Sequence, residues 1–146
     1  MKSAILLPFL MSIVTLTLIG ERSLAEEVRL EGWKTSHQEA WRAAQAEQRP
    51  MLMYITTSNC VYCRKMVQET LSEDHVAHDI QANFVPVSLT AQGNRLLVRR
   101  LRVQSYPTTV IISPRSVVLD YISGFVGPEE MHNRLTTAAR KSPAVR

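Results

Sequence analysis

The chain has 146 residues, of which 45% are hydrophobic and 21% are charged, and its formal net charge is +4 at pH 7. This length suits one domain, and the composition has an ordinary globular balance. The mild basic excess argues only weakly for nucleic acid, so we expect no nucleic-acid partner. Two cysteines are too few for a disulfide scaffold, and the core must therefore come from packing.

The N-terminal segment has the pattern of a secretory signal peptide. Residues 4–19 are almost entirely apolar, and a helix of that length would span roughly 24 Å, less than the ~30 Å hydrocarbon core of a membrane. Ser23 and Ala25 place small residues where a signal peptide is cleaved. We therefore expect a signal peptide at residues 1–25 and a periplasmic or secreted domain at residues 26–146, without stable membrane insertion. An uncleaved membrane anchor is the open alternative.

The mature chain is expected to begin with an edge strand near residues 28–33, followed by a helix and a buried strand. The helix is predicted at residues 36–49, because Ser36 and Glu39 have the spacing of a capping box. The short apolar run at residues 51–56, MLMYIT, predicts a strand that is buried on both faces.

A polar break separates this strand from the two cysteines. Ser58 or Asn59 is expected to cap a helix that starts near Cys60, since both residue types are preferred at helix N-caps. A second break is predicted at residues 72–78, with Ser72 as a further candidate cap. The cysteine pair therefore lies at a junction between a strand and a helix.

The second half of the chain continues this alternation and ends in a hairpin and a helix. Its predicted elements are a strand at residues 83–89, a helix at 94–103, strands at 108–113 and 117–122, and a helix at 128–140. Pro128 suits the first position of the last helix. Alternating strands and helices that end in this way predict an α/β sandwich with a mixed central sheet flanked by helices.

The cysteine pair has the spacing of a redox dithiol, of half a zinc site and of a small structural disulfide. Backbone N–H groups at the start of a helix would stabilise a thiolate at Cys60, so its pKa should fall below the free value of about 8.5. Cys63 lies one turn further along and should be more buried. This division predicts thiol–disulfide exchange in which Cys60 attacks and Cys63 resolves.

Three segments of the chain resemble the thioredoxin-like superfamily. MLMYITTSNCVYCRKM resembles its active-site segment, and it looks most like exported members whose strand ends in Tyr before a C-x-x-C. YPTTVIIS resembles its cis-proline loop, and ISGFVGPEEM resembles its closing strand, glycine and helix. The resemblance covers roughly residues 32–140 and implies a thioredoxin-like three-layer sandwich.

The resemblance implies a thiol–disulfide oxidoreductase that needs no metal and no cofactor beyond the Cys60–Cys63 dithiol. It also implies that Pro107 is cis and lies against the sulfurs, and that the backbone of Tyr106 pairs with an extended substrate chain. Tyr62 lies beside the reactive sulfur, so we expect it to be partly exposed and to contribute to substrate docking. The expected partners are protein thiols or disulfides and a membrane redox partner.

The sequence departs from thioredoxin around the cysteines. Val61 and Tyr62 replace the Gly-Pro dipeptide between the cysteines, and Asn59 replaces the preceding Trp. Tyr54 occupies the position of a buried Asp that assists proton transfer, and a phenol with a pKa near 10 is a poor base at neutral pH. The direction of electron flow and the redox potential therefore stay undecided, with a reductase or isomerase slightly favoured.

Three other interpretations of the cysteines stay open. His75 and His78 complete a C-x2-C-x11-H-x2-H pattern, but a helix over residues 60–72 would hold Cys60 and His75 about 22 Å apart, so zinc is disfavoured. A copper-binding metallochaperone would use both thiolates with help from Met66, whose helical spacing places it in the core first. A non-catalytic binding domain would carry the pair as a structural disulfide.

The helix predicted at residues 94–103 carries a basic face. Its members are Arg95, Arg99, Arg100 and Arg102. We expect this face to be solvated, and recognition of an acidic partner is the alternative.

Overall fold

A four-stranded mixed sheet forms the centre of the computed structural model, which describes residues 30–142. The strands are β1 Met51–Thr56, β2 Val85–Thr90, β3 Thr108–Ile112 and β4 Val118–Ser123. They lie in the order β2-β1-β3-β4, with β1 parallel to β2 and antiparallel to β3, and with β4 antiparallel to β3. The predicted signal peptide at residues 1–25 lies outside the described residues.

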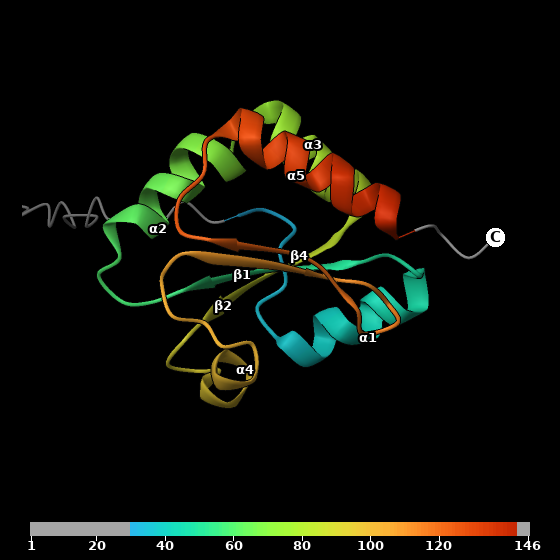
Figure 1. Cartoon of the computed structure of the whole chain (residues 1–146), viewed down its shortest axis with the longest axis horizontal. Coiled ribbons are helices and arrows are strands. Elements are labelled where there is room, and N and C mark those ends of the chain that lie inside the picture. The colour runs from blue at the N-terminus through green and yellow to red at the C-terminus, as the bar shows by residue number, and fades with distance from the viewer. Residues whose placement is uncertain (1–29, 143–146) are drawn as a thin grey trace, which may run out of the picture.

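Helices cover both faces of this sheet (Figure 1). They are α1 His37–Glu47, α2 Val61–Met66, the π-helix η1 Val67–Leu71, α3 Asp74–Asn83, α4 Arg95–Arg100 and α5 Pro128–Lys141. One core lies beneath α2, η1, α3 and α5, and a second core lies beneath α1 and α4. Among the residues that the structure describes, no helix is long and apolar enough to cross a membrane. The mixed sheet between two helical layers confirms the predicted fold class.

The central strand β1 is buried on both faces, as its apolar run predicts. Leu52 and Tyr54 belong to the core beneath α2 and α5. Met51 and Met53 belong to the core beneath α1 and α4. Side chains alternate across a strand, so a strand covered by helices on both faces is apolar at successive positions. This buried strand leads the chain to the cysteines.

Two helix starts follow their predicted signals. The hydroxyl of Ser36 accepts a hydrogen bond from the backbone N–H of Glu39 at 3.4 Å and caps α1. Pro128 begins α5, at a position where a backbone N–H would have no partner within the helix. Met131 and Leu135 then bury one face of α5 against the sheet. Helix α5 thus closes the layer that also contains α2.

Helix α3 shows that the break predicted at residues 72–78 is wrong. Its N-cap residue is Glu73 and not Ser72. Val76 and Ile80 lie one turn apart and are both fully buried, so they anchor the helix despite its polar composition. Two apolar positions among polar ones gave too weak a periodic signal to predict this helix.

The edge strand predicted near residues 28–33 is not formed in the described part of that range. Residues 31–32 lie in a turn. Lys34 makes a single parallel bridge to Val87 of β2. One bridge fixes the chain at the edge of the sheet without adding a strand, and residues 28–29 lie outside the described residues.

Candidate active site

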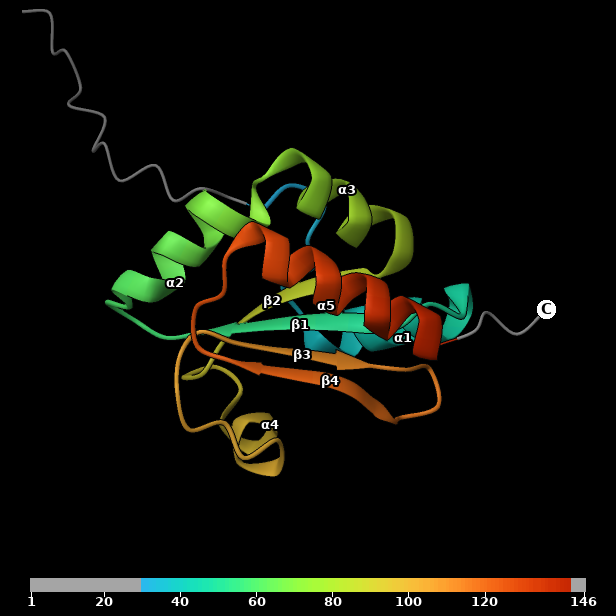
Figure 2. The ribbon, with the colours of Figure 1, turned by 45° about the horizontal axis from the view of Figure 1, so that its top comes forward.

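The two cysteines lie where β1 leads into α2, at one end of the sheet (Figure 2). Cys60 and Cys63 form a disulfide, with 5.2 Å between their Cα atoms. Cys60 is itself the N-cap residue of α2, so the predicted cap at Ser58 or Asn59 is wrong. Asn59 instead adopts a left-handed conformation with φ of 57°, which Asn tolerates better than most residues, and it turns the chain into the helix.

The two sulfurs have different surroundings. Cys60 is partly exposed, and its Sγ accepts a hydrogen bond from the backbone N–H of Cys63 at 3.1 Å. This N–H is one of the free donors of the first helical turn, and it would stabilise a thiolate at Cys60 after reduction. Cys63 is only 4% exposed and belongs to the core with Met66. An incoming sulfur therefore reaches Cys60 more easily than Cys63.

Tyr54 supports the site from the sheet. Its side chain is buried, and its hydroxyl donates a hydrogen bond to the carbonyl oxygen of Cys63 at 2.8 Å. The ring of Trp33 packs edge-on against the Tyr54 ring, with 6.4 Å between their centroids. Burial raises the pKa of Tyr54 well above its ordinary value of 10.0, so the hydroxyl is neutral at neutral pH. Tyr54 thus holds the backbone of Cys63 as a hydrogen-bond donor.

Tyr106 and Pro107 lie at the same end of the sheet as the disulfide. Their peptide bond is cis, and Pro107 is buried. Thr108 begins β3 and pairs with Ile55 of β1, so the proline lies beside the segment that leads to Cys60. Tyr106 is half-buried and packs against both cores. The sheet register therefore brings these distant residues toward the cysteines, and their contact with substrate stays a prediction.

Val61 and Tyr62 form an exposed apolar surface beside the disulfide. They are 65% and 62% exposed, respectively. Large apolar side chains that are exposed next to one another often mark a contact surface for another molecule. The exposure expected for Tyr62 is observed, and its part in docking stays a prediction.

Two contacts near the site had no signal in the local sequence. The side-chain amide of Gln92 donates to the hydroxyl of Thr57 at 2.7 Å, which ties the segment before α4 to the segment before Cys60. The ammonium group of Lys65 lies 4.6 Å from the centroid of the Phe125 ring. Both contacts join residues that are far apart in the chain, so only the assembled fold shows them.

Thr109 is a further residue that the sequence pattern did not single out. It lies directly opposite Tyr54 in the pairing of β1 with β3, so both side chains share one face of the sheet. Thr109 is 1% exposed, and its hydroxyl has no hydrogen-bond partner among the described residues. A threonine in a strand is expected for its β-branched shape, which packs well in a sheet. The sequence therefore did not indicate that its hydroxyl would lie next to Tyr54.

The zinc interpretation finds no ligand set within residues 30–142. No group of three or more His, Cys, Asp or Glu side chains within residues 30–142 is arranged to hold a metal ion. The ring of His75 packs against that of His132 in α5, with 5.7 Å between the centroids. Met66 is fully buried, as its helical spacing predicted. The described residues therefore give zinc no support, whereas the copper interpretation, which would use the Cys60 and Cys63 thiolates, stays an alternative.

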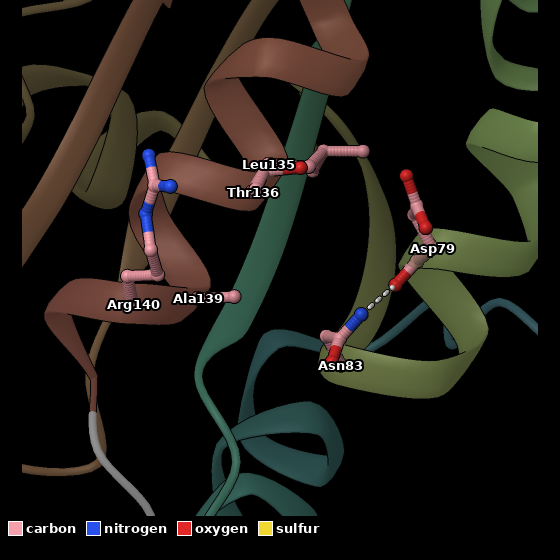
Figure 3. Close-up of a pocket in the computed structure, with 6 residues that line it drawn as sticks. All are labelled: Asp79, Asn83, Leu135, Thr136, Ala139 and Arg140. Carbon is pink, nitrogen blue, oxygen red and sulfur yellow. Dashed lines mark hydrogen bonds between the residues drawn. The ribbon is translucent and has the colours of Figure 1, made fainter.

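A cavity of about 330 Å³ lies between α3 and α5 (Figure 3). Its lining residues are Asp79, Asn83, Leu135, Thr136, Ala139 and Arg140. The side-chain amide of Asn83 donates to the backbone carbonyl of Asp79 at 3.0 Å, and Arg140 points away from both. The lining contains no cysteine and no histidine. The cavity is therefore separate from the disulfide and adds no group to its chemistry.

Solved structures share this fold. A thioredoxin from Thermus thermophilus is 27% identical with a TM-score of 0.71, over 77% of this chain and 92% of that one. A DsbH oxidoreductase is 19% identical with a TM-score of 0.66, over 74% and 83% of the two chains. The reduced C-terminal domain of DsbD from Neisseria meningitidis is 17% identical with a TM-score of 0.59, over 69% and 92%. The last two similarities concern the fold alone.

The sequence itself also matches known proteins. An uncharacterized protein of Archaeoglobus fulgidus is 27% identical over 90 residues, which cover 62% of this chain and 70% of that protein. The family model of a thioredoxin-like domain matches residues 37–139, from the start of α1 into the last turn of α5. This match spans most of the chain and includes both cysteines and the cis-proline. The chain belongs to the thioredoxin-like domain family.

Proposed function

We propose that this protein is a thiol–disulfide oxidoreductase that exchanges disulfides with protein substrates. A thioredoxin-like fold that carries a C-x-x-C disulfide suggests this activity. The observation that carries the proposal is that the two sulfurs have unequal surroundings. Cys60 is partly exposed, and its Sγ accepts a hydrogen bond from the backbone N–H of Cys63, whereas Cys63 is only 4% exposed. Exchange needs one sulfur that a substrate can reach and a second sulfur held within reach of the first.

In the reducing direction, the thiolate of Cys60 attacks one sulfur of a substrate disulfide. A bond forms between Cys60 Sγ and that sulfur, and the other substrate sulfur leaves as a thiolate. The thiolate of Cys63 then attacks Cys60 Sγ, so the Cys60–Cys63 bond forms and the second substrate sulfur leaves. Two electrons pass to the substrate, and the protein returns to the disulfide form. The same steps in reverse oxidise a substrate dithiol.

The second attack requires Cys63 to lose its proton. Tyr54 donates its own hydrogen to the Cys63 carbonyl, and burial keeps it neutral, so it is a poor acceptor for this proton. We infer that solvent hydroxide takes the proton, which makes resolution slow at neutral pH and faster as the pH rises. A long-lived mixed disulfide suits the rearrangement of substrate disulfides. This supports isomerisation, one of the two directions that the sequence slightly favours.

Substrates are proposed to cross the disulfide as an extended chain. The position of Pro107 beside the end of β1 supports strand-like pairing of the substrate with the backbone of Tyr106. The exposed ring of Tyr62, one residue before Cys63, offers a second contact near the disulfide. Tyr62→Ala should raise the KM for a protein substrate more than the KM for a small aromatic disulfide. Equal changes for both substrates would contradict this docking role.

The site of action is proposed to be the periplasm or the outside of the cell. The signal-peptide pattern at residues 1–25 supports export. A close cysteine pair in an oxidising compartment is oxidised unless a partner reduces it, so we propose a membrane redox partner that supplies electrons. N-terminal sequencing of the exported protein should begin at Glu26. A start at Met1 would instead support a retained anchor.

Trapping of substrates in the native host tests the proposed activity. Cys63→Ser should leave Cys60 joined to substrate proteins by mixed disulfides that dithiothreitol releases, because the resolving sulfur is absent. The matched control, with both cysteines changed to Ser, should trap nothing. The unmodified protein should also catalyse the reduction of insulin by dithiothreitol. An empty trap together with no insulin reduction would show that the proposal is wrong.

A further inference from the structure

We propose that one exposed face of α4 docks an acidic protein surface beside the disulfide. This docking surface consists of Arg95, Leu96, Arg99 and Arg100 of α4 and of Arg102 in the turn after it. The inference rests on the proposed exchange with protein substrates, and it specifies their chemistry. The partner is a protein whose reacting disulfide or dithiol is flanked by Asp and Glu residues.

The arginines of the docking surface are exposed, and no ion pair within residues 30–142 includes any of them. Exposed arginines elsewhere in residues 30–142 also lack ion pairs, but only here do four of them gather on one short segment, and two other arginines are paired within the chain. Arg49 pairs with Glu47 at 2.8 Å, and Arg134 pairs with Asp120 at 2.7 Å. The guanidinium groups on α4 therefore keep their donors for carboxylates of another molecule.

Charges of opposite sign are separated in this chain. Residues 66–94 contain acidic side chains and no Lys or Arg, whereas residues 95–107 contain arginines and no Asp or Glu. The acidic side chains lie on η1 and on or just before α3, on the face of the sheet opposite to α4. The field of this arrangement attracts an acidic partner toward α4 and repels it from α3.

Leu96 gives the docking surface an apolar centre. It is 69% exposed, whereas Leu97 and Leu101 pack against the second core and hold the helix in place. Arginine around an exposed apolar side chain is typical of protein interfaces. A membrane surface requires a broader apolar face than one leucine supplies. The composition of the docking surface therefore favours a protein over a lipid bilayer.

The docking surface is connected to the disulfide through short segments. Asn94 is the N-cap residue of α4, and nearby Gln92 is hydrogen-bonded to Thr57, which lies shortly before Cys60. After α4 the chain continues to the Tyr106–Pro107 bond. Both ribbon views show α4 in the half of the molecule that contains the junction of β1 with α2 (Figures 1 and 2). A partner held on α4 can therefore present its sulfurs to the site.

Two synthetic peptides test this inference. Both carry the same internal disulfide, which is flanked by several Glu residues in one peptide and by Gln residues in the other. Their reduction by the full chain, with dithiothreitol as the terminal reductant, is measured by alkylation and mass spectrometry. At low ionic strength we expect the acidic peptide to react roughly tenfold faster than the Gln peptide, because attractive charge raises the association rate. High salt should remove the difference.

A triple variant assigns this preference to α4. R95Q/R99Q/R100Q should lower the ratio of the two rates from roughly ten to about one. The matched control R42Q/R115Q/R140Q removes the same charge from exposed arginines elsewhere and should keep the ratio. Circular dichroism of both variants checks that the fold is retained.

The outcomes separate this inference from the proposed function. Equal rates for the two peptides with the unmodified chain, or equal loss of preference in both triple variants, would overturn the docking inference and leave the exchange activity intact. Failure of the unmodified chain to reduce either peptide or insulin would remove the proposed function, and the inference with it. Binding to phosphatidylglycerol vesicles without a preference for the acidic peptide would assign the arginines to a membrane and also overturn the inference.

Discussion

The two faces of α2 differ in what surrounds them. On the outer face, Val61 and Tyr62 are exposed beside the partly exposed sulfur of Cys60. On the inner face, Cys63 and Met66 are buried in the core. We therefore propose that the outer face controls what reaches the disulfide, whereas the inner face holds the helix that carries it against the core. Substitutions on the two faces should change different properties.

The largest expected effect is the difference in stability between substitutions on the two faces of α2. Met66→Ala should lower the free energy of unfolding by about 2–5 kcal/mol, because it leaves a cavity in the core. Tyr62→Ala, on the outer face, should change it by no more than about 0.5 kcal/mol. Urea denaturation of the oxidised proteins measures both values. Similar losses in the two variants would contradict the division of α2.

The hydrogen bond between Tyr54 and Cys63 provides the next test of the inner face. Tyr54→Phe removes the donor and leaves the buried carbonyl of Cys63 without it, so stability should fall by about 1–3 kcal/mol. Tyr121→Phe is the matched control, since its hydroxyl makes only a long 3.4 Å bond to the Arg102 carbonyl. Denaturant unfolding measures both variants. Equal losses of stability would show that the hydrogen bond from Tyr54 to Cys63 stabilises the fold no more than the long bond of Tyr121.

Two neighbouring threonines should give smaller changes in stability, and the changes should have opposite signs. Thr109→Val replaces a buried hydroxyl that has no partner within residues 30–142 with a methyl group, and it should raise the free energy of unfolding by up to about 1 kcal/mol. Thr108→Val should lower it by about 1 kcal/mol, because the Thr108 hydroxyl donates to the Ser105 carbonyl at 2.7 Å. Destabilisation in both variants would indicate that the Thr109 hydroxyl has a partner.

The smallest effect concerns pH and lies away from α2. Burial lowers the pKa of His37 in α1 below its ordinary value of 6.5. The unfolded chain therefore binds a proton more readily, and the contribution of His37 to stability is present above pH 6.5 and lost as the pH falls through its lower folded value. His37→Gln should weaken the decrease in Tm between pH 7 and about pH 5.5. An unchanged decrease in Tm would show that groups other than His37 cause it.

The sequence predicted best those elements whose signal is local. Residues 51–56 form the expected buried strand, because every position is apolar or β-branched. The position of the cysteines after this strand also follows from neighbouring residues. Pro107 was placed near them by a resemblance of motifs, since no local pattern specifies a cis peptide bond.

The parts that were missed depend on contacts between distant segments. Helix α3 is held by Val76 and Ile80 against the core, which its polar sequence does not indicate. Cys60 caps α2 although cysteine is not among the preferred cap residues, because its sulfur accepts the N–H of Cys63. The bond from Tyr54 to the Cys63 carbonyl likewise requires the strand and the helix to be packed together. The sequence therefore predicted where the cysteine pair lies, but not the contacts that hold it there.

Alkylation of the reduced protein tests the inequality of the cysteines most directly. Limiting iodoacetamide would be applied between about pH 5 and pH 10, and mass spectrometry of the digest would report the modification of each cysteine. The account predicts that Cys60 reacts first, with an apparent pKa below the free-thiol value of about 8.5, and that Cys63 reacts more slowly at every pH. Equal rates, or faster modification of Cys63, would contradict it.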